Sequence, residues 1–162
     1  MKKIIVVLAV LITVLAGTRY YKINSGIPKK YYEDKYSINE WVDVGNSKIK
    51  IEEYDISENL EDNTKVEVLL SVKNLDPNFN INYLTNSILS IGGNQSIFSG
   101  IVSEEDLNDE KKIQMCFEFY RVKVENGDEV RFNIARDLYL KQVKDMYYDN
   151  KLYSKYILLE TA

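Results

Sequence analysis

The feature that most constrains the fold of this chain is an alternation of apolar and polar residues with a period of two. It is clearest over residues 65–73, where Val66, Val68, Leu70 and Val72 recur at every second position. A β-strand places successive side chains on opposite faces, whereas a helix repeats every 3.6 residues. We therefore expect this segment to be a strand with one face in the core.

Similar short runs recur from Ile38 onward and are separated by turn-forming residues such as Gly92-Gly93-Asn94 and Asn126-Gly127-Asp128. The expected strands are residues 41–44, 48–56, 66–72, 80–83, 87–91, 97–102, 113–119, 130–134 and 152–159. Seven to nine short strands with frequent turns are typical of an all-β sandwich. After Glu52-Glu53 the alternation slips by one residue, which predicts a β-bulge.

Three segments are harder to assign. Residues 137–148 fit either a helix or a strand, and their density of tyrosine and β-forming residues favours a strand. Residues 104–110 are acidic and predict a loop or a single helical turn. Residues 22–37 are polar and of mixed charge, which is typical of a tether, with a helical turn expected near residues 31–36.

The N-terminus has the pattern of a membrane signal. Two lysines precede an apolar run that extends from Ile4 to Ala16 and is broken only by Thr13. The run alone has the length of a signal-peptide core, and with residues 17–21 it approaches the thickness of a bilayer. The side chains expected to contact lipid are Ile4, Val7, Leu8, Leu11 and Leu15.

Three interpretations of this segment stay open: a retained anchor, which we favour, a signal peptide cleaved between Ala16 and Gly17, and a buried core helix. Basic residues flank the run on both sides, so the positive-inside rule favours neither orientation. A basic start followed at once by an apolar run is the secretory pattern. We expect a single-pass membrane protein with an extracytoplasmic domain, or a secreted protein if the segment is cleaved.

The expected organisation is therefore an N-terminal hydrophobic membrane helix over residues 1–21, a polar tether over 22–37 and a β-sandwich domain over 38–162. A length of 162 residues suits one such domain.

Composition excludes several classes of function. The chain has no histidine and one cysteine, which removes Ser/His and Cys/His catalysis, internal disulfides and cysteine-based zinc sites. The net charge of −4 argues against nucleic acid as a partner. Cys116 lacks a base that could form a thiolate, so a structural thiol is expected. We expect no cofactor, no metal site and no catalytic residue.

The thirteen tyrosines are the remaining suggestive feature. Tyrosine supplies rigid, amphipathic contact area and is enriched at protein interfaces. Four of them, Tyr147, Tyr148, Tyr153 and Tyr156, cluster near the C-terminus and form the candidate binding surface.

Two segments resemble a known family. Ser37-Ile-Asn-Glu-Trp-Val-Asp-Val-Gly-Asn46 with Lys48–Ile51, and Val66-Glu-Val-Leu-Leu-Ser-Val-Lys-Asn74, resemble strands of telokin-like, immunoglobulin-fold domains of unknown function. The resemblance covers residues 38–134 and implies an immunoglobulin-like antiparallel β-sandwich. Such domains occur in small lipoproteins and membrane-anchored proteins of Gram-positive bacteria. Thr18 stands where a lipoprotein would carry its lipidated cysteine.

These observations predict a non-catalytic, membrane-anchored binding module of the cell envelope. Its partners would be the membrane, through the N-terminal segment, and a protein or a cell-wall polymer. A membrane-tethered inhibitor or immunity factor is the first alternative. The second is an envelope hydrolase that uses a pair of carboxylates, because the 25 acidic residues make some suitably spaced pair inevitable.

Overall fold

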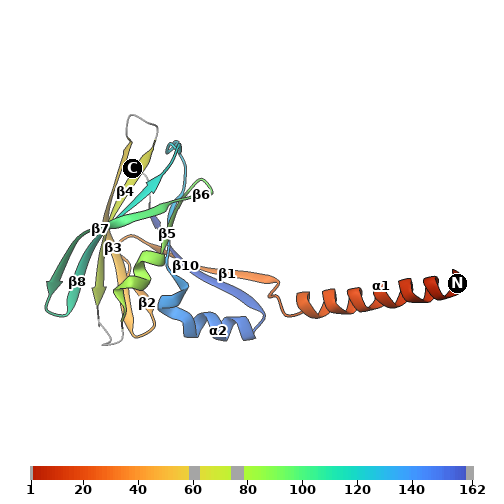
Figure 1. Ribbon diagram of the computed structural model, residues 1–162. Helices are drawn as coiled ribbons and strands as arrows, with labels where there is room; N and C mark the ends of the chain where they lie inside the picture. Colours follow the sequence, from red (N-terminus) through yellow and green to blue (C-terminus); the bar gives the residue numbers. More distant parts are fainter. Residues whose placement is uncertain (1, 59–62, 74–78, 160–162) are drawn as a thin grey trace.

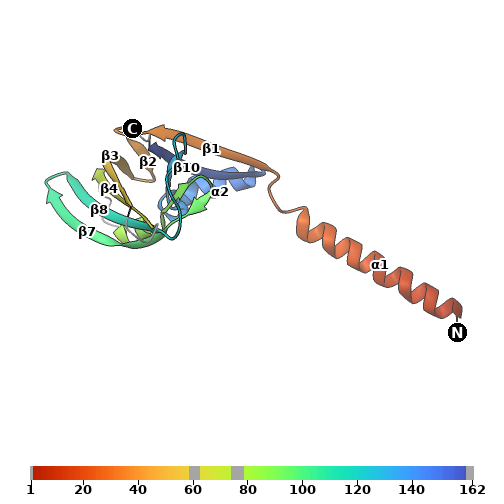
Figure 2. The same cartoon turned by 90° about the horizontal axis from the view of Figure 1, so that it is seen from above.

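A computed structural model describes residues 2–58, 63–73 and 79–159 of the protein. It contains a long N-terminal helix followed by a β-sandwich of two five-stranded sheets (Figure 1). Figures 1 and 2 both show the helix projecting from the sandwich, at the end where β1 and β10 begin. The elements, with η for 3-10 helices, are α1 (Lys2–Asn24), β1 (Lys30–Ser37), β2 (Val42–Val44), β3 (Ser47–Glu58), β4 (Thr64–Lys73), η1 (Ile81–Asn86), β5 (Ile88–Ile91), β6 (Asn94–Gln95), β7 (Ile97–Leu107), β8 (Glu110–Phe119), β9 (Val130–Asn133), η2 (Arg136–Tyr139), α2 (Leu140–Tyr148) and β10 (Lys151–Leu159).

The strands are divided between the two sheets in a fixed order. Sheet A has the order β1-β10-β9-β5-β6 and sheet B the order β2-β3-β4-β8-β7. All neighbouring strands are antiparallel except β1 and β10, which pair in parallel from Lys30 opposite Lys151 to Ser37 opposite Leu158. The prediction of an all-β sandwich is confirmed, but sheet A is mixed and not purely antiparallel.

The core lies between the sheets and is built by the alternation seen in the sequence. In β4, Val66, Val68, Leu70 and Val72 are all fully buried, as the period of two predicts. Phe117 of β8 joins the sheets, because its ring packs edge-on against Phe132 of β9 with centroids 5.8 Å apart. Apolar packing of this kind is what holds one sheet to the other.

The predicted β-bulge is confirmed. The register of β3 against β4 shifts between Ile51 and Glu53, so one extra residue is accommodated on β3. The turn at Asn126-Gly127 is also present, and Gly127 adopts a φ of 96°, which suits glycine.

The strand predicted for residues 137–148 is wrong, because η2 and α2 occupy this segment. Val143 and Met146 both pack against the core. Side chains three residues apart share a helix face but point to opposite faces of a strand. Helical spacing therefore outweighed the β-forming composition of the segment.

The helical turn expected near residues 31–36 is also wrong. Within the stretch predicted as a tether, residues 30–37 form β1 and lie beside β10. Tyr36 packs against the core, and the Tyr153 hydroxyl donates a hydrogen bond to the Asp34 carboxylate. The partner strand is more than a hundred residues away in sequence, so local composition carries no signal for this pairing.

Two smaller expectations are corrected in the same way. Residues 81–86 form η1, not a strand, and the Asn80 side chain caps this helix by accepting a hydrogen bond from the backbone N–H of Asn82 at 3.0 Å. The acidic segment 104–110 is mostly strand, with a turn at residues 108–109. In the hairpin that β7 and β8 form, the Glu104 carboxylate lies 2.8 Å from Lys111 Nζ on the neighbouring strand.

The outer face of sheet B carries a compact charge network. Glu52 lies between two lysines, with its oxygens 2.7 Å from Lys112 Nζ and 3.0 Å from Lys50 Nζ. The hydrogen bond from Lys112 is the main reason that the pKa of Glu52 falls from 4.5 to about 2. The network joins Lys50 and Glu52 of β3 to Lys112 of β8 across the intervening strand β4.

We predict that Phe117→Ala lowers the free energy of unfolding by about 3–5 kcal/mol, because it empties the contact that joins the sheets. Urea denaturation monitored by circular dichroism measures this. Ile97→Ala, which changes a side chain that is 59% exposed, is the control and should stay within about 0.5 kcal/mol of the unmodified chain. Equal effects of the two substitutions would contradict the assigned core.

We predict a pH-dependent contribution from Glu52. Its folded pKa is lowered, so its stabilisation is complete above the unfolded pKa of 4.5 and is lost as the pH falls towards 2. Glu52→Gln should therefore cost about 1 kcal/mol at pH 7 and clearly less near pH 2, where Glu52 is partly protonated. Urea denaturation across this pH range tests the difference, with the exposed Glu53→Gln as control. A difference independent of pH would argue against the network.

Candidate functional site

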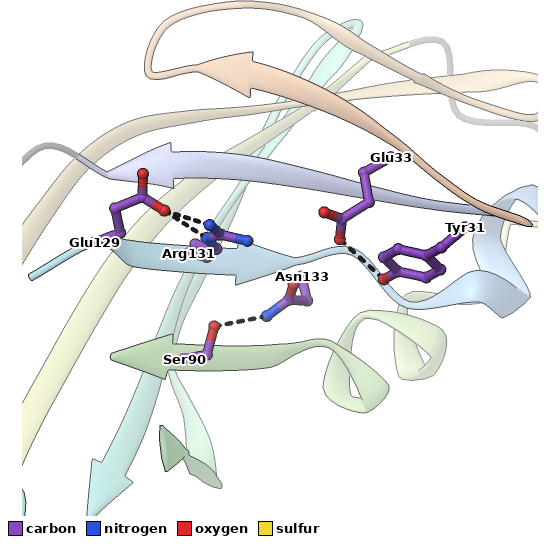
Figure 3. Close-up of polar contacts among 6 residues, drawn as sticks. All are labelled: Tyr31, Glu33, Ser90, Glu129, Arg131 and Asn133. Atoms are coloured by element: carbon purple, nitrogen blue, oxygen red, sulfur yellow. Dashed lines mark hydrogen bonds and ion pairs between the residues drawn. The ribbon is translucent and has the colours of Figure 1, made fainter. Parts of the chain in front are cut away.

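A hollow with a volume of about 530 Å³ lies on the outer face of sheet A. We call it the sheet A hollow. Strands β1, β10, β9 and β5 form its floor side by side (Figure 3). It is lined by Tyr31, Asn86, Ile88, Ser90, Gly93, Gln95, Arg131, Asn133, Ile134, Ala135, Arg136, Ser154 and Lys155.

Strand alternation decides which side chains reach this hollow. Val130 and Phe132 of β9 are fully buried, so the residues that alternate with them, Arg131 and Asn133, stand on the outer face. Asn133 is in register with Ile88 of β5 and Tyr156 of β10. Sheet pairing therefore gathers polar side chains from four strands that are distant in sequence.

At one side of the hollow, β1 and β10 share a hydrogen-bonded triad. Tyr31 Oη donates to Glu33 Oε1 at 2.9 Å and lies 2.9 Å from Ser154 Oγ, and Ser154 Oγ also donates to Glu33 Oε1 at 3.3 Å. The Tyr31 side chain is 58% exposed. The triad holds an accessible aromatic ring in a defined position.

The centre of the hollow is organised by Asn133. Its side-chain amide nitrogen donates to Ser90 Oγ and to the carbonyl oxygen of Ile88, both at 3.1 Å (Figure 3). With its amide nitrogen committed to β5, the amide oxygen is the group that Asn133 can offer to a ligand.

Arg131 is one of two arginines that line the hollow, the other being Arg136. Its Nε donates to Glu129 Oε2 at 2.9 Å, and its guanidinium lies over the Tyr156 ring, 4.8 Å from the centroid. The Glu129 carboxylate holds the pKa of Arg131 above its usual range, and Arg131 in turn lowers the pKa of Glu129. The Arg131 guanidinium is thereby held between the Glu129 carboxylate and the Tyr156 ring.

These groups form a recognition surface in which aromatic, amide, hydroxyl and guanidinium groups are fixed by their neighbours. Such planar polar groups can hydrogen-bond sugars, peptides or carboxylates. In the described part of the chain, no three His, Cys, Asp or Glu side chains gather in a way that could hold a metal ion.

A buried lysine borders the hollow on its inner side. Lys155 is only 3% exposed, and its Nζ donates to the carbonyl oxygen of Asp43 in sheet B at 2.6 Å. The ammonium also lies 5.3 Å from the Tyr139 ring centroid. Burial lowers the pKa of Lys155. The Lys155 side chain therefore links sheet A to sheet B.

The structure separates the four tyrosines of the candidate binding surface. Tyr147 and Tyr148 lie on α2 with 48% and 84% of their side chains exposed, whereas Tyr153 and Tyr156 are buried. Tyr153 packs against Tyr139 in the core, and Tyr156 is covered by Arg131. Of these four tyrosines, Tyr147 and Tyr148 are the exposed ones.

The expected lipid-contacting residues all fall within α1. Leu11 and Leu15 are 54% and 62% exposed, whereas the side chains of Ile4, Val7 and Leu8 lie outside the described residues. Ala16 and Gly17 are helical. Among the described residues, no helix combines the length and the hydropathy needed to cross a membrane.

Cys116 is a buried free thiol on β8. Burial raises its pKa, which disfavours the reactive thiolate.

Comparison with known proteins identifies a similar fold. No protein-family model matches the sequence, and no curated protein matches it. An uncharacterized β-sandwich protein from Clostridium difficile 630, known from a crystal structure, superposes with a TM-score of 0.50 at 11% sequence identity. The match covers 82% of this chain and 99% of that protein. At this identity, the likeness supports a shared β-sandwich fold.

Residues of the sheet A hollow were missed by sequence reasoning. The alternation around Val130 and Phe132 does predict that Arg131 and Asn133 point outward. What the sequence lacks is any signal that β1, β10 and β5 lie beside them.

Proposed function

We propose that this protein is a non-catalytic binding module that α1 holds at the cell membrane, with the sandwich on the extracytoplasmic side. The observation that carries the proposal is an apolar helix that projects away from the sandwich. The described apolar side chains Val10, Leu11, Ile12, Val14 and Leu15 are each more than half exposed. Exposed apolar area of this extent favours a lipid or protein environment around the helix.

The immunoglobulin-like affiliation is part of the same proposal. Support comes from strand order: β3-β4-β8-β7 follows the A-B-E-D order of immunoglobulin sheets, and β10-β9-β5-β6 follows G-F-C-C′. In this scheme β1 and β2 are additions at the edges. The proposal includes a relationship to the telokin-like domains of membrane-anchored proteins of Gram-positive bacteria, which the sequence resembles.

Electrostatics support a role without catalysis. A general acid needs a carboxyl group with a raised pKa. Among the described residues, the carboxyl groups with resolved shifts are Glu52, Glu67 and Glu129, and in each the pKa is lowered by a hydrogen-bonded lysine or arginine. A lowered pKa keeps these carboxyl groups ionised at neutral pH, which suits an ion pair and does not suit a general acid.

The sheet A hollow is the face that we propose for ligand binding. Its donors and acceptors come from several strands and are held by hydrogen bonds, which limits the entropy lost when a ligand binds. The ligand would be a protein or an envelope polymer. If the ligand is a protein, the module would act by inhibiting a wall-active enzyme or a toxin.

We predict that Leu11→Arg combined with Leu15→Arg moves the protein from the membrane to the soluble fraction. The two positions share one helix face, and each buried arginine opposes insertion by about 2.5 kcal/mol or more. Fractionation and immunoblotting measure the change. The control is Ile97→Arg with Leu107→Arg, which adds the same charges at exposed sandwich positions and should leave the protein at the membrane.

Two further measurements on the same cells separate the alternatives. The first measurement is N-terminal sequencing of the membrane and secreted fractions. Cleavage after Ala16 would make Gly17 the first residue of the mature protein, whereas a retained anchor keeps the residues before it. Protease added to intact cells should digest the sandwich; protection until the membrane is breached would contradict an extracytoplasmic domain.

We predict that a photo-reactive residue at Gln95, in the sheet A hollow, crosslinks to an envelope component in intact cells. The same residue at Lys48, on sheet B, should give no such adduct. Arg131→Ala should lower the yield at Gln95 roughly tenfold, as expected when a central interface residue is lost. Equal adducts from both positions would contradict this face, and the composition of the adduct distinguishes a protein from a polymer.

A further inference from the structure

Two chain segments distant in sequence meet where α1 joins the sandwich. The hydroxyl of Tyr147, near the end of α2, donates to the carbonyl oxygen of Gly26 at 2.8 Å. Four residues further along each segment, Lys30 and Lys151 are partners at the start of the parallel strands β1 and β10. Figures 1 and 2 place both strand starts at the end that faces α1. We call residues 22–32 and 147–151 the α1-facing end.

The charge of the α1-facing end is opposite to that of the whole protein. It carries four lysines, Lys22, Lys29, Lys30 and Lys151, and a single acid, Asp149, although the chain has a net charge of −4. Lys22, Lys29 and Lys30 are exposed. None of the four lysines forms an ion pair with a residue that the structure describes, so their charges are available to a partner.

Aromatic side chains accompany these lysines. Tyr31, Tyr32 and Tyr148 are 58%, 51% and 84% exposed, and Ile27 in the same segment is half exposed. The Lys151 ammonium lies 6.0 Å from the Tyr32 ring centroid. Tyrosine and lysine together are typical of a surface that lies at the headgroup level of a membrane, where one part of the side chain is apolar and the other is wet.

We propose that the α1-facing end is a docking surface for anionic phospholipid headgroups. This inference rests on the proposed membrane attachment of α1, because that attachment places this end of the sandwich nearest the bilayer. Lysines near an anionic bilayer are attracted over about one Debye length. Docking would hold the sandwich against the membrane in one orientation, whichever side of the membrane it occupies.

Orientation has a consequence for the sheet A hollow. Tyr31 belongs to both surfaces, since it lies at the start of β1 and also lines the hollow. A docked domain would therefore hold the hollow close to the membrane surface.

The test uses the full chain in nanodiscs of phosphatidylcholine alone or of phosphatidylcholine mixed with phosphatidylglycerol. A limiting amount of an amine-reactive reagent is added, and mass spectrometry gives the reaction rate of each lysine. We expect Lys29, Lys30 and Lys151 to react about fivefold more slowly in the anionic nanodiscs, which corresponds to about 1 kcal/mol per lysine at such a surface. High salt should remove this protection.

Controls come from the same chain. Lys48 and Lys73, on the outer face of sheet B, should react equally in both nanodiscs. Lys29→Gln with Lys30→Gln should also return the rate at Lys151 to its value in phosphatidylcholine, because the surface docks as a unit. Lys48→Gln with Lys73→Gln should leave the protection of Lys151 intact.

The outcomes distinguish the two proposals. A chain that co-elutes with both nanodiscs but shows equal lysine reactivity in them overturns the docking surface and leaves the attachment of α1 standing. A chain that co-elutes with neither overturns the attachment, and the docking surface with it. Protection that persists in high salt would also overturn the electrostatic mechanism.

Discussion

The structure depends on apolar contact between two sheets that no disulfide joins. Phe117 contributes to this contact, because its ring packs against the Phe132 ring of sheet A and against the Phe98 ring of its own sheet, whose centroid is 5.7 Å away. The alternation along β4 and β8 directs one face of sheet B into the core and leaves the intervening residues on its outer face. The residues left on the outer faces are those that form the charge network around Glu52 on one side and the sheet A hollow on the other.

The parallel pairing of β1 with β10 connects this core to the proposed function. It places Tyr31 beside Ser154 at the edge of the hollow and brings Lys30 beside Lys151 at the α1-facing end. The two strands also begin at the end of the sandwich from which α1 projects. One non-local contact thus positions a candidate ligand surface and a candidate membrane surface within the same part of the molecule.

Local patterns predicted the elements whose neighbours are near in sequence or whose alternation is strict. The strand around Val68, the bulge near Glu52 and the turn at Gly127 are of this kind. The predictions were wrong where the structure of a segment depends on residues far away in the sequence. Residues 30–37 form the strand β1 because they pair with β10. Residues 140–148 form the helix α2, which lets both Val143 and Met146 pack against the core. For the candidate site, alternation indicates that Arg131 and Asn133 point outward, but the clustering of C-terminal tyrosines along the chain did not predict that Tyr153 and Tyr156 are buried.

The sequence by itself determined the all-β sandwich, the absence of histidine and disulfide chemistry, and the apolar character of the N-terminal segment, because these follow from residue type and period alone. Only the tertiary structure decided which side chains share a surface. Neighbouring strands in a sheet come from distant parts of the chain, and the pairing that joins them is chosen by the packing of the whole core. Tyr31, Ser90, Arg131 and Ser154 therefore meet at one hollow although no local pattern links them.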